Sequence, residues 1–280
     1  MLKGINQWCY PEGTPLEKVF EYSSNAGFDA VELNVYEENG IGLTLDTTAR
    51  EAEMIVKQAE KQGLKLPSLS TALLWKAPLS SSDERIREHG RNIVKKQLEL
   101  ASVMGIDTIL VVPGLVNAET SYEACYELSQ NELRNLSAVA ETKEVHIGVE
   151  NVWNRFLLSP LEMARYIDEI DSDYVGAYFD VGNVLQFGYP EQWIRILKDR
   201  IRKVHVKDFS TKVGNITGFV PLLSGDVNWT SVMEALREIG YHDVITAELT
   251  PYHISPNELA NDTARHMDVI LASGTAAQRV

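Results

Sequence analysis

The chain has 280 residues, 44% of them hydrophobic, and a formal net charge of −14. This length suits one large domain, and no apolar run approaches the roughly 20 residues of a membrane helix, so we expect no membrane association. The negative charge disfavours a nucleic-acid partner, because it repels a phosphate backbone. Cys9 and Cys125 lie in unrelated contexts, and the N-terminal segment lacks an apolar signal region. We therefore expect a cytoplasmic protein without disulfides.

Strand-like runs alternate with helical stretches along the chain. Strands are predicted at 2–8, 28–35, 64–71, 107–114, 146–151, 174–183, 201–209 and 243–250. Helices, with apolar residues at three- and four-residue steps or with clear start signals, are predicted at 15–27, 48–63, 83–105, 121–143, 161–170, 191–199 and 229–240. Eight strands alternating with helices, without a dividing linker, favour a single α/β domain over residues 1–280. We predict a (β/α)8 TIM barrel rather than an open doubly wound sheet.

Four ionisable residues lie at or near the ends of the last four predicted strands. They are Glu150, Asp180, His205 and Glu248. The C-terminal ends of barrel strands meet at one mouth, so these side chains would converge there. Three carboxylates and one imidazole suit a hard divalent cation, which would also compensate charges that are costly at the end of an apolar run. The pattern predicts one shared divalent metal ion, with Mn²⁺ favoured by the oxygen-rich set and Mg²⁺, Co²⁺ or Zn²⁺ as alternatives.

The segments GVEN, FDVGN, HVKD and AEL carry these residues in this order. They resemble the xylose-isomerase-like superfamily of sugar isomerases and epimerases, and the resemblance covers essentially the whole chain. FDVGN, VHVKD and VPLLSGDVNW are most similar to the branch of L-ribulose/L-xylulose 5-phosphate 3-epimerases and hexulose-6-phosphate isomerases. The resemblance implies that all four residues hold the metal, that Glu150 and Glu248 also transfer protons, and that the protein is a homodimer or homotetramer.

The chemistry is consistent with these implied roles. Epimerisation removes a proton beside a sugar carbonyl and returns it from the other side, so it needs two opposed acid–base groups. A metal lowers the cost of the enediolate that forms between the two transfers. Glu150 and Glu248 come from strands that are not neighbours in the ring, so they could flank a substrate. We expect an isomerase or epimerase of a small ketose or ketose phosphate.

Candidate substrate contacts are Asn6, Trp8, Asn183 and Lys207. Asn6 and Trp8 end the first strand, although Trp8 could equally be core packing. Asn183 stands where ketohexose 3-epimerases place a histidine, a departure that argues against a free ketohexose, and it could instead cap a helix. Lys207 could meet a substrate oxygen or phosphate, or extend into solvent. Glu32 could bind a sugar hydroxyl or pair with a cation inside the barrel.

Three other functions remain open from the sequence. Endonuclease IV-like members of the superfamily need further histidines for three zinc ions, but STALLW, VVPG and DVGN contain none at the corresponding places. An inosose-dehydratase-like lyase would begin with the same proton abstraction and then lose water. A non-catalytic sugar binder would not require both glutamates.

Overall fold

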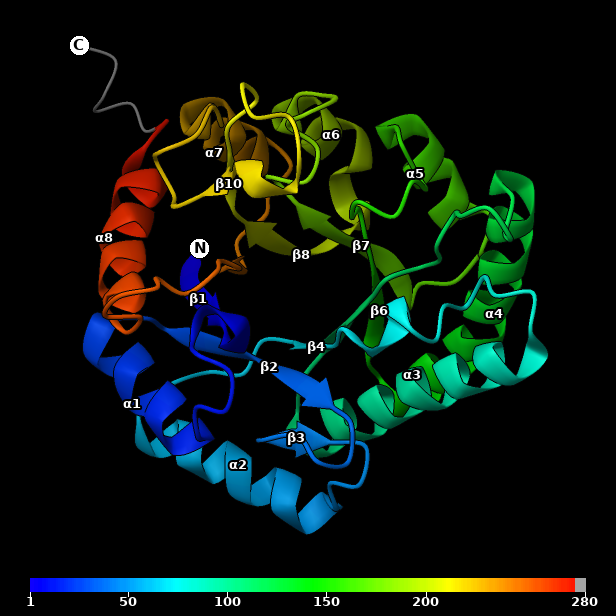
Figure 1. Cartoon of the computed structure of the whole chain (residues 1–280), viewed down its shortest axis with the longest axis horizontal. Helices are drawn as coiled ribbons and strands as arrows, with labels where there is room; N and C mark the ends of the chain where they lie inside the picture. Colours follow the sequence, from blue (N-terminus) through cyan, green and yellow to red (C-terminus); the bar gives the residue numbers. More distant parts are fainter. Residues whose placement is uncertain (275–280) are drawn as a thin grey trace.

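The computed structural model describes residues 1–274, so the last six positions of the predicted 1–280 domain lie outside the described residues. Within residues 1–274, eight parallel strands form the barrel: β1 (Leu2–Asn6), β2 (Ala30–Tyr36), β4 (Leu69–Ser70), β5 (Thr108–Val111), β6 (His146–Glu150), β7 (Val175–Asp180), β8 (Ile201–Val206) and β11 (Val244–Ala247). Their order is β1-β11-β8-β7-β6-β5-β4-β2, and pairing of β1 with β2 closes the ring (Figure 1). The predicted TIM barrel is confirmed.

The strands form where apolar residues can be buried on both faces. All six residues of β7 are buried, because one face fills the barrel interior and the other meets the helix layer. The third barrel strand is much shorter than the predicted run 64–71. It is reduced to Leu69–Ser70, with an isolated bridge between Ala30 and Lys65. Pro67 lies between them, and its missing N–H interrupts the hydrogen-bond ladder.

In the described part of the chain, eight α-helices surround the barrel: α1 (Leu16–Ala26), α2 (Ala49–Lys61), α3 (Glu84–Met104), α4 (Tyr122–Lys143), α5 (Pro160–Asp168), α6 (Pro190–Leu197), α7 (Trp229–Glu238) and α8 (Glu258–Ala272). Seven match predicted helices, but α8 was missing from the prediction. It lies beside α1 and completes the outer ring (Figure 1). The sequence signals for the beginning and end of helices act as expected. Ser159 accepts a hydrogen bond from the Glu162 amide at the start of α5, and Gly105 ends α3 in a left-handed conformation.

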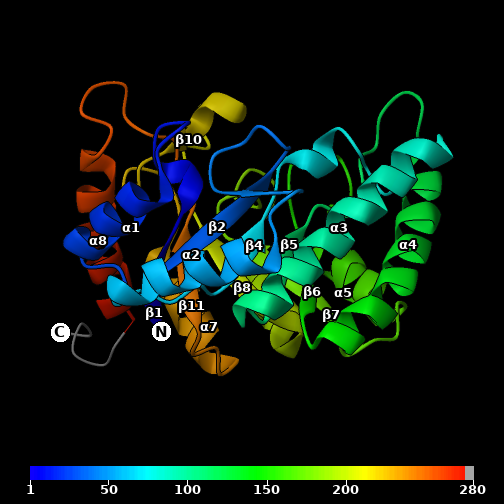
Figure 2. The same cartoon turned by 90° about the horizontal axis from the view of Figure 1, so that it is seen from below.

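Several short strands and 3₁₀ turns lie in the loops between the barrel strands and the helices. They are β3 (Leu43–Thr44) beside β2, the antiparallel pair β9 (Asp208–Phe209) and β10 (Phe219–Val220), and the 3₁₀ turns η1 (Gln7–Cys9), η2 (Leu73–Trp75), η3 (Lys198–Arg200) and η4 (Ile216–Gly218). Figure 2 shows β10 and the loop before α8 at one end of the barrel, opposite the N-terminus. This end carries the C-terminal ends of the strands. Among the described residues, no helix is long and apolar enough to cross a membrane.

Gly90 in α3 allows this helix to pack closely on the preceding loop. A Cβ placed there would lie 2.4 Å from the backbone oxygen of Ala77 and 3.2 Å from a side-chain carbon of Leu79. Gly90→Ala should therefore destabilise the protein by about 1–3 kcal/mol through overpacking, although alanine alone would favour the helix by about 1 kcal/mol. Urea unfolding measures the effect. Ser102→Ala, on the exposed face of α3, is the control and should leave stability within about 0.5 kcal/mol. A more stable Gly90→Ala protein would contradict this packing argument.

Candidate active site

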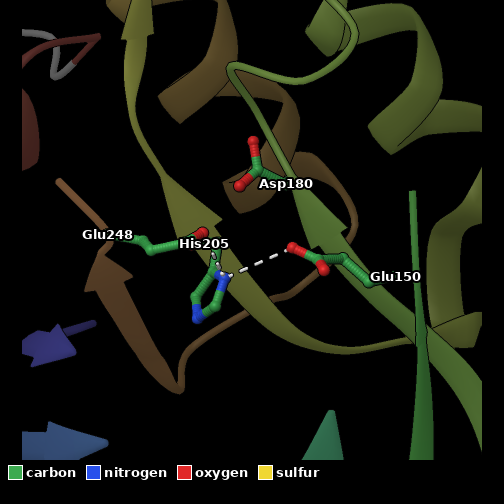
Figure 3. A group of neighbouring side chains, drawn as sticks. All are labelled: Glu150, Asp180, His205 and Glu248. Atoms are coloured by element: carbon green, nitrogen blue, oxygen red, sulfur yellow. Dashed lines mark ion pairs between the residues drawn. The ribbon is translucent and has the colours of Figure 1, made fainter. Parts of the chain in front are cut away.

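The four predicted metal ligands converge at the mouth of the barrel. Glu150 and Asp180 are the last residues of β6 and β7, His205 lies in β8, and Glu248 follows β11. Each contributes one ligand atom, and these atoms all lie within 4.8 Å of one another. Figure 3 shows the two glutamates on either side of the His205 ring, with Asp180 beside them. Within residues 1–274, this is the one group of at least three His, Cys, Asp or Glu side chains that could hold a metal ion.

The two nitrogens of His205 face different surroundings. Nδ1 lies 3.6 Å from Glu150 Oε1 and 3.3 Å from Glu248 Oε2, as the dashed lines in Figure 3 mark. Nε2 lies 2.7 Å from Glu32 Oε1, on the opposite side of the ring. Glu32 is fully buried and pairs with this imidazole inside the barrel.

Asp180 is fixed by its own backbone and by the neighbouring strand. Its amide donates to Asn151 Oδ1 at 2.9 Å, and Asn151 Nδ2 donates back to the Asp180 carbonyl at 2.8 Å. The Asn183 amide donates to Asp180 Oδ1 at 2.8 Å. Asp180 Oδ2 faces Lys207 and the other candidate ligands, so one carboxylate oxygen is held by the backbone and the other can act as a ligand.

Lys207 lies within the cluster and not in solvent. Its Nζ is 2.8 Å from Glu248 Oε2 and 3.1 Å from Asp180 Oδ2, and it lies 5.2 Å from the centre of the Phe219 ring. Burial lowers the pKa of Lys207, but the carboxylates of Asp180 and Glu248 outweigh burial and hold that pKa above its ordinary value. A permanent ammonium group therefore partly balances the three negative ligands.

The two glutamates have pKa values shifted in opposite directions. Burial raises the pKa of Glu150 to about 7. Burial also acts on Glu248, but Lys207 and His205 outweigh it and hold the pKa of Glu248 well below its usual range. For His205, burial favours the neutral ring, but the surrounding carboxylates, Glu32 first, raise its pKa well above the ordinary value. The site thus combines one glutamate that is readily protonated with one that stays ionised.

The donor set fits a divalent cation. Among the described residues, Asp180 Oδ2 and His205 Nδ1 are buried atoms without a hydrogen-bond partner, although Lys207 Nζ lies near the first. Native proteins rarely leave such atoms unsatisfied, and both are typical metal-ligand atoms. Glu150, Asp180, His205 and Glu248 could therefore hold the ion. The carboxylates match the preferences of Mg²⁺ and Mn²⁺, and the imidazole is also compatible with Zn²⁺ or Co²⁺.

The remaining predicted residues lie around this cluster in different environments. The Asn6 side chain is fully buried and bonds to Glu32 Oε1 at 2.5 Å and to the Trp8 amide at 2.6 Å. Trp8 is half-buried in η1, where it lines a cavity of about 560 Å³ with Tyr36 and other loop residues. Both substrate contacts stay predictions.

Asn183 lies close to the ligands but does not cap a helix. Its Nδ2 donates to the Asn151 carbonyl at 3.0 Å, and residues 181–187 form turns, so there is no helix at this point to cap. Trp153 Nε1 donates to the Asn183 carbonyl at 2.8 Å. The substrate contact of Asn183 also stays a prediction.

Sequence reasoning missed the polar side chains that support the ligands from within the barrel. Ser68 Oγ donates to Glu32 Oε2 at 2.5 Å, and the hydroxyl of Tyr178 donates to the same oxygen. Asn151, which holds Asp180 through two hydrogen bonds, follows Glu150 in the segment GVEN without a signal of its own. A signal was present for Tyr178, because it occurs two residues before Asp180 and so points to the same face of β7. Ser68 lies in the interrupted third strand and had no such signal.

Known proteins resemble this chain in both sequence and fold. The model of the family described as "Xylose isomerase-like TIM barrel" matches residues 20–270. L-ribulose-5-phosphate 3-epimerase UlaE of Escherichia coli O157:H7 is 25% identical over 247 residues, which are 85% of this chain and 83% of UlaE. The solved structure of L-ribulose 3-epimerase has a TM-score of 0.81 and 17% identity, and the match covers 96% of this chain and 94% of that chain.

A crystal structure of the IOLI protein with a bound zinc atom has a TM-score of 0.80 and 18% identity, and the match covers 99% of this chain and all of that chain. At these identities the solved structures establish a shared fold. The family model reaches from α1 into α8 and includes all four candidate ligands. The resemblance seen in the sequence is thereby confirmed, and the chain belongs to the xylose isomerase-like TIM barrel family.

Proposed function

We propose that this protein is a divalent-metal-dependent isomerase or epimerase that acts on a small ketose or ketose phosphate. The observation that carries the proposal is the position of Glu150 and Glu248, which approach His205 Nδ1 to 3.6 and 3.3 Å from strands separated in the barrel by β7 and β8. Two acid–base groups on different sides of one ion suit proton removal from a carbon and proton return to it. The relative UlaE, named as an L-ribulose-5-phosphate 3-epimerase, supports this reaction class.

The residues of the site divide the chemistry between them. Glu150, Asp180, His205 and Glu248 would hold a divalent ion, which would supply stabilisation of the negative charge of enolisation. Glu248, ionised beside Lys207, is suited to accept a proton, and Glu150, whose pKa burial raises to about 7, is suited to carry one. Asp180 and His205 act as ligands only. Two glutamates in unlike surroundings can thus divide proton removal and proton return between them.

Lys207 is the substrate contact that we favour at the reacting end of the sugar. Its ammonium group lies within hydrogen-bond or ion-pair distance of two ligands, so it can reach an oxygen bound at the same centre. Trp8 lines the cavity between the loops after β1 and β2 and would contact the far end of the substrate. Asn183 and Asn6 complete the proposed set. A cytoplasmic location and a homodimer or homotetramer belong to the same proposal.

A deuterium-exchange screen tests the proposed function. The Mn²⁺-loaded protein is incubated in deuterated buffer with pentuloses, hexuloses and their phosphates, and exchange at the carbon beside the carbonyl is followed by mass spectrometry after metal removal. We expect one substrate class to gain deuterium, seen as a mass increase, without any loss of water. Loss of water from the product would instead indicate the dehydratase-like lyase. A metal-loaded protein that exchanges none of the sugars would contradict catalysis on ketoses and favour a sugar binder.

Metal binding should stabilise the folded protein. At a free Mn²⁺ concentration 100 times the dissociation constant, the free energy of unfolding should rise by about 2.7 kcal/mol, because the ion binds only the folded cluster. Urea unfolding with and without Mn²⁺ measures the rise. Asp180→Asn removes one ligand charge and should abolish most of it, whereas Asp226→Asn, an exposed carboxylate bonded to Thr211, should leave it unchanged. An equal rise in both variants would rule out this cluster as the site.

A further inference from the structure

Glu32 is a buried carboxylate that the proposed reaction does not use. It lies in β2, across the barrel from the strands that carry the ligands, and its exposed fraction is zero. Oε1 lies 2.7 Å from His205 Nε2 and 2.5 Å from Asn6 Nδ2. Oε2 accepts hydrogen bonds from Ser68 Oγ and the Tyr178 hydroxyl. Each carboxylate oxygen therefore has two polar neighbours within the protein.

We propose that Glu32 is a positioning residue that keeps a proton on His205 Nε2 and presents Nδ1 to the metal centre. An ionised carboxylate can only accept hydrogen bonds, so the ring nitrogen that faces Glu32 must be the one that donates. When the imidazole is neutral, its single N–H is then on Nε2, and the lone pair on Nδ1 points toward Glu150 and Glu248. The inference rests on the metal centre of the proposed function, but it concerns how this chain prepares its one nitrogen ligand.

The surroundings of Glu32 favour its ionised form and restrict the movement of the Glu32–His205 pair. Asn6 Nδ2, Ser68 Oγ and the Tyr178 hydroxyl donate to its two carboxylate oxygens, and donated hydrogen bonds favour the ionised form. The Tyr178 ring also packs against the His205 ring, with centroids 4.5 Å apart at 58°. Tyr178 thus contacts both members of the pair, and the imidazole has little freedom to rotate. Supporting hydrogen bonds of this kind typically affect metal affinity by about 10–100-fold.

The first test examines the wild-type protein and needs no variant. The protein is labelled with ¹⁵N-histidine and loaded with Zn²⁺, which is diamagnetic, and the imidazole nitrogens of His205 are assigned by NMR through loss of their signals in His205→Asn. We expect zinc on Nδ1 and a protected N–H on Nε2. Zinc on Nε2, or a ring without a proton on Nε2, would overturn the inference. A wild-type protein that binds no zinc would refute the proposed metal centre itself, which is a separate failure.

The second test measures affinity for Zn²⁺ by competition with a chelator. Glu32→Gln keeps the shape but removes the obligate acceptor, and we expect the dissociation constant to rise about 10–100-fold. Tyr178→Phe keeps the ring and removes one hydrogen bond to Glu32, so the loss of Zn²⁺ affinity should be smaller in this variant. Asp243→Asn is the matched control, because it weakens a carboxylate–cation pair with Lys203 at the other end of the barrel. The affinity of this variant for Zn²⁺ should match that of the wild type.

Two results of the affinity test would count against Glu32 as a positioning residue. A folded Glu32→Gln protein that binds Zn²⁺ within twofold of wild type would overturn the inference. So would an equal loss of affinity in Asp243→Asn, since that would report general destabilisation. If Glu32→Gln does not fold, NMR of the wild type and of Tyr178→Phe replaces this measurement. Zinc on His205 Nδ1 in both proteins would support the inference, and zinc on Nε2 would overturn it.

Discussion

Glu150→Gln and Glu248→Gln should each reduce the rate of deuterium exchange into one epimer of the substrate by about 10²–10⁴-fold. Each change removes a proton carrier while keeping the size and shape of the side chain. The two residues approach the same imidazole nitrogen from β6 and from the end of β11, so neither can easily replace the other. Stereochemistry should separate their roles, because each glutamate serves one face of the carbon. One variant should exchange only one epimer of the substrate, and the other variant only the opposite epimer.

The measurement compares single-turnover exchange for both epimers at saturating Mn²⁺, so that weaker metal binding does not imitate a lost proton transfer. Glu238→Gln is the control, because this exposed glutamate pairs with Arg195 on the outer helices. Its exchange rate should equal that of the wild type. If either active-site variant retained near-full exchange of both epimers with metal bound, the two-glutamate mechanism would be wrong.

His205→Ala should destabilise the metal-free protein by about 3–5 kcal/mol, a large effect for a residue at a functional site. The change removes the partner of Glu32, which is completely buried and 2.7 Å from the ring. It also leaves Glu150 and Glu248 facing each other with Lys207 as the nearby counter-charge. A buried carboxylate without its partner is costly, and the lost ring leaves a cavity as well.

A double variant separates the charge from the cavity. In His205→Ala/Glu32→Gln the unpaired charge is gone but the cavity remains, so part of the lost stability should return. Urea unfolding of the wild type, both single variants and the double variant gives the interaction energy of the pair. A double variant as unstable as the sum of the two single changes would show that Glu32 and His205 are not energetically coupled.

The sequence predicted the metal ligands because they obey a rule of the barrel that operates along the chain. Each lies at or close to the end of an apolar strand, and any closed parallel barrel brings those ends to one mouth. Helix α8 was not predicted, because its position depends on packing and not on a pattern along the chain. Its segment ELANDTARHMDVILA opens without a side-chain cap and carries its polar residues among the apolar ones. It is placed by packing against α1 and α7, which local sequence does not describe.

What the sequence determined by itself is the order of strands and helices, the barrel they form and the ligand types at its mouth, because these depend on periodicity and on which residue ends each strand. The tertiary structure alone decided what each polar group does there. Glu32 and His205 are 173 residues apart, and Lys207 meets Glu248 across 41 residues. Such contacts depend on barrel closure, register and side-chain direction. Which polar side chains of the barrel interior lie beside the ligands is therefore a question of three-dimensional placement, and only the closed barrel shows it.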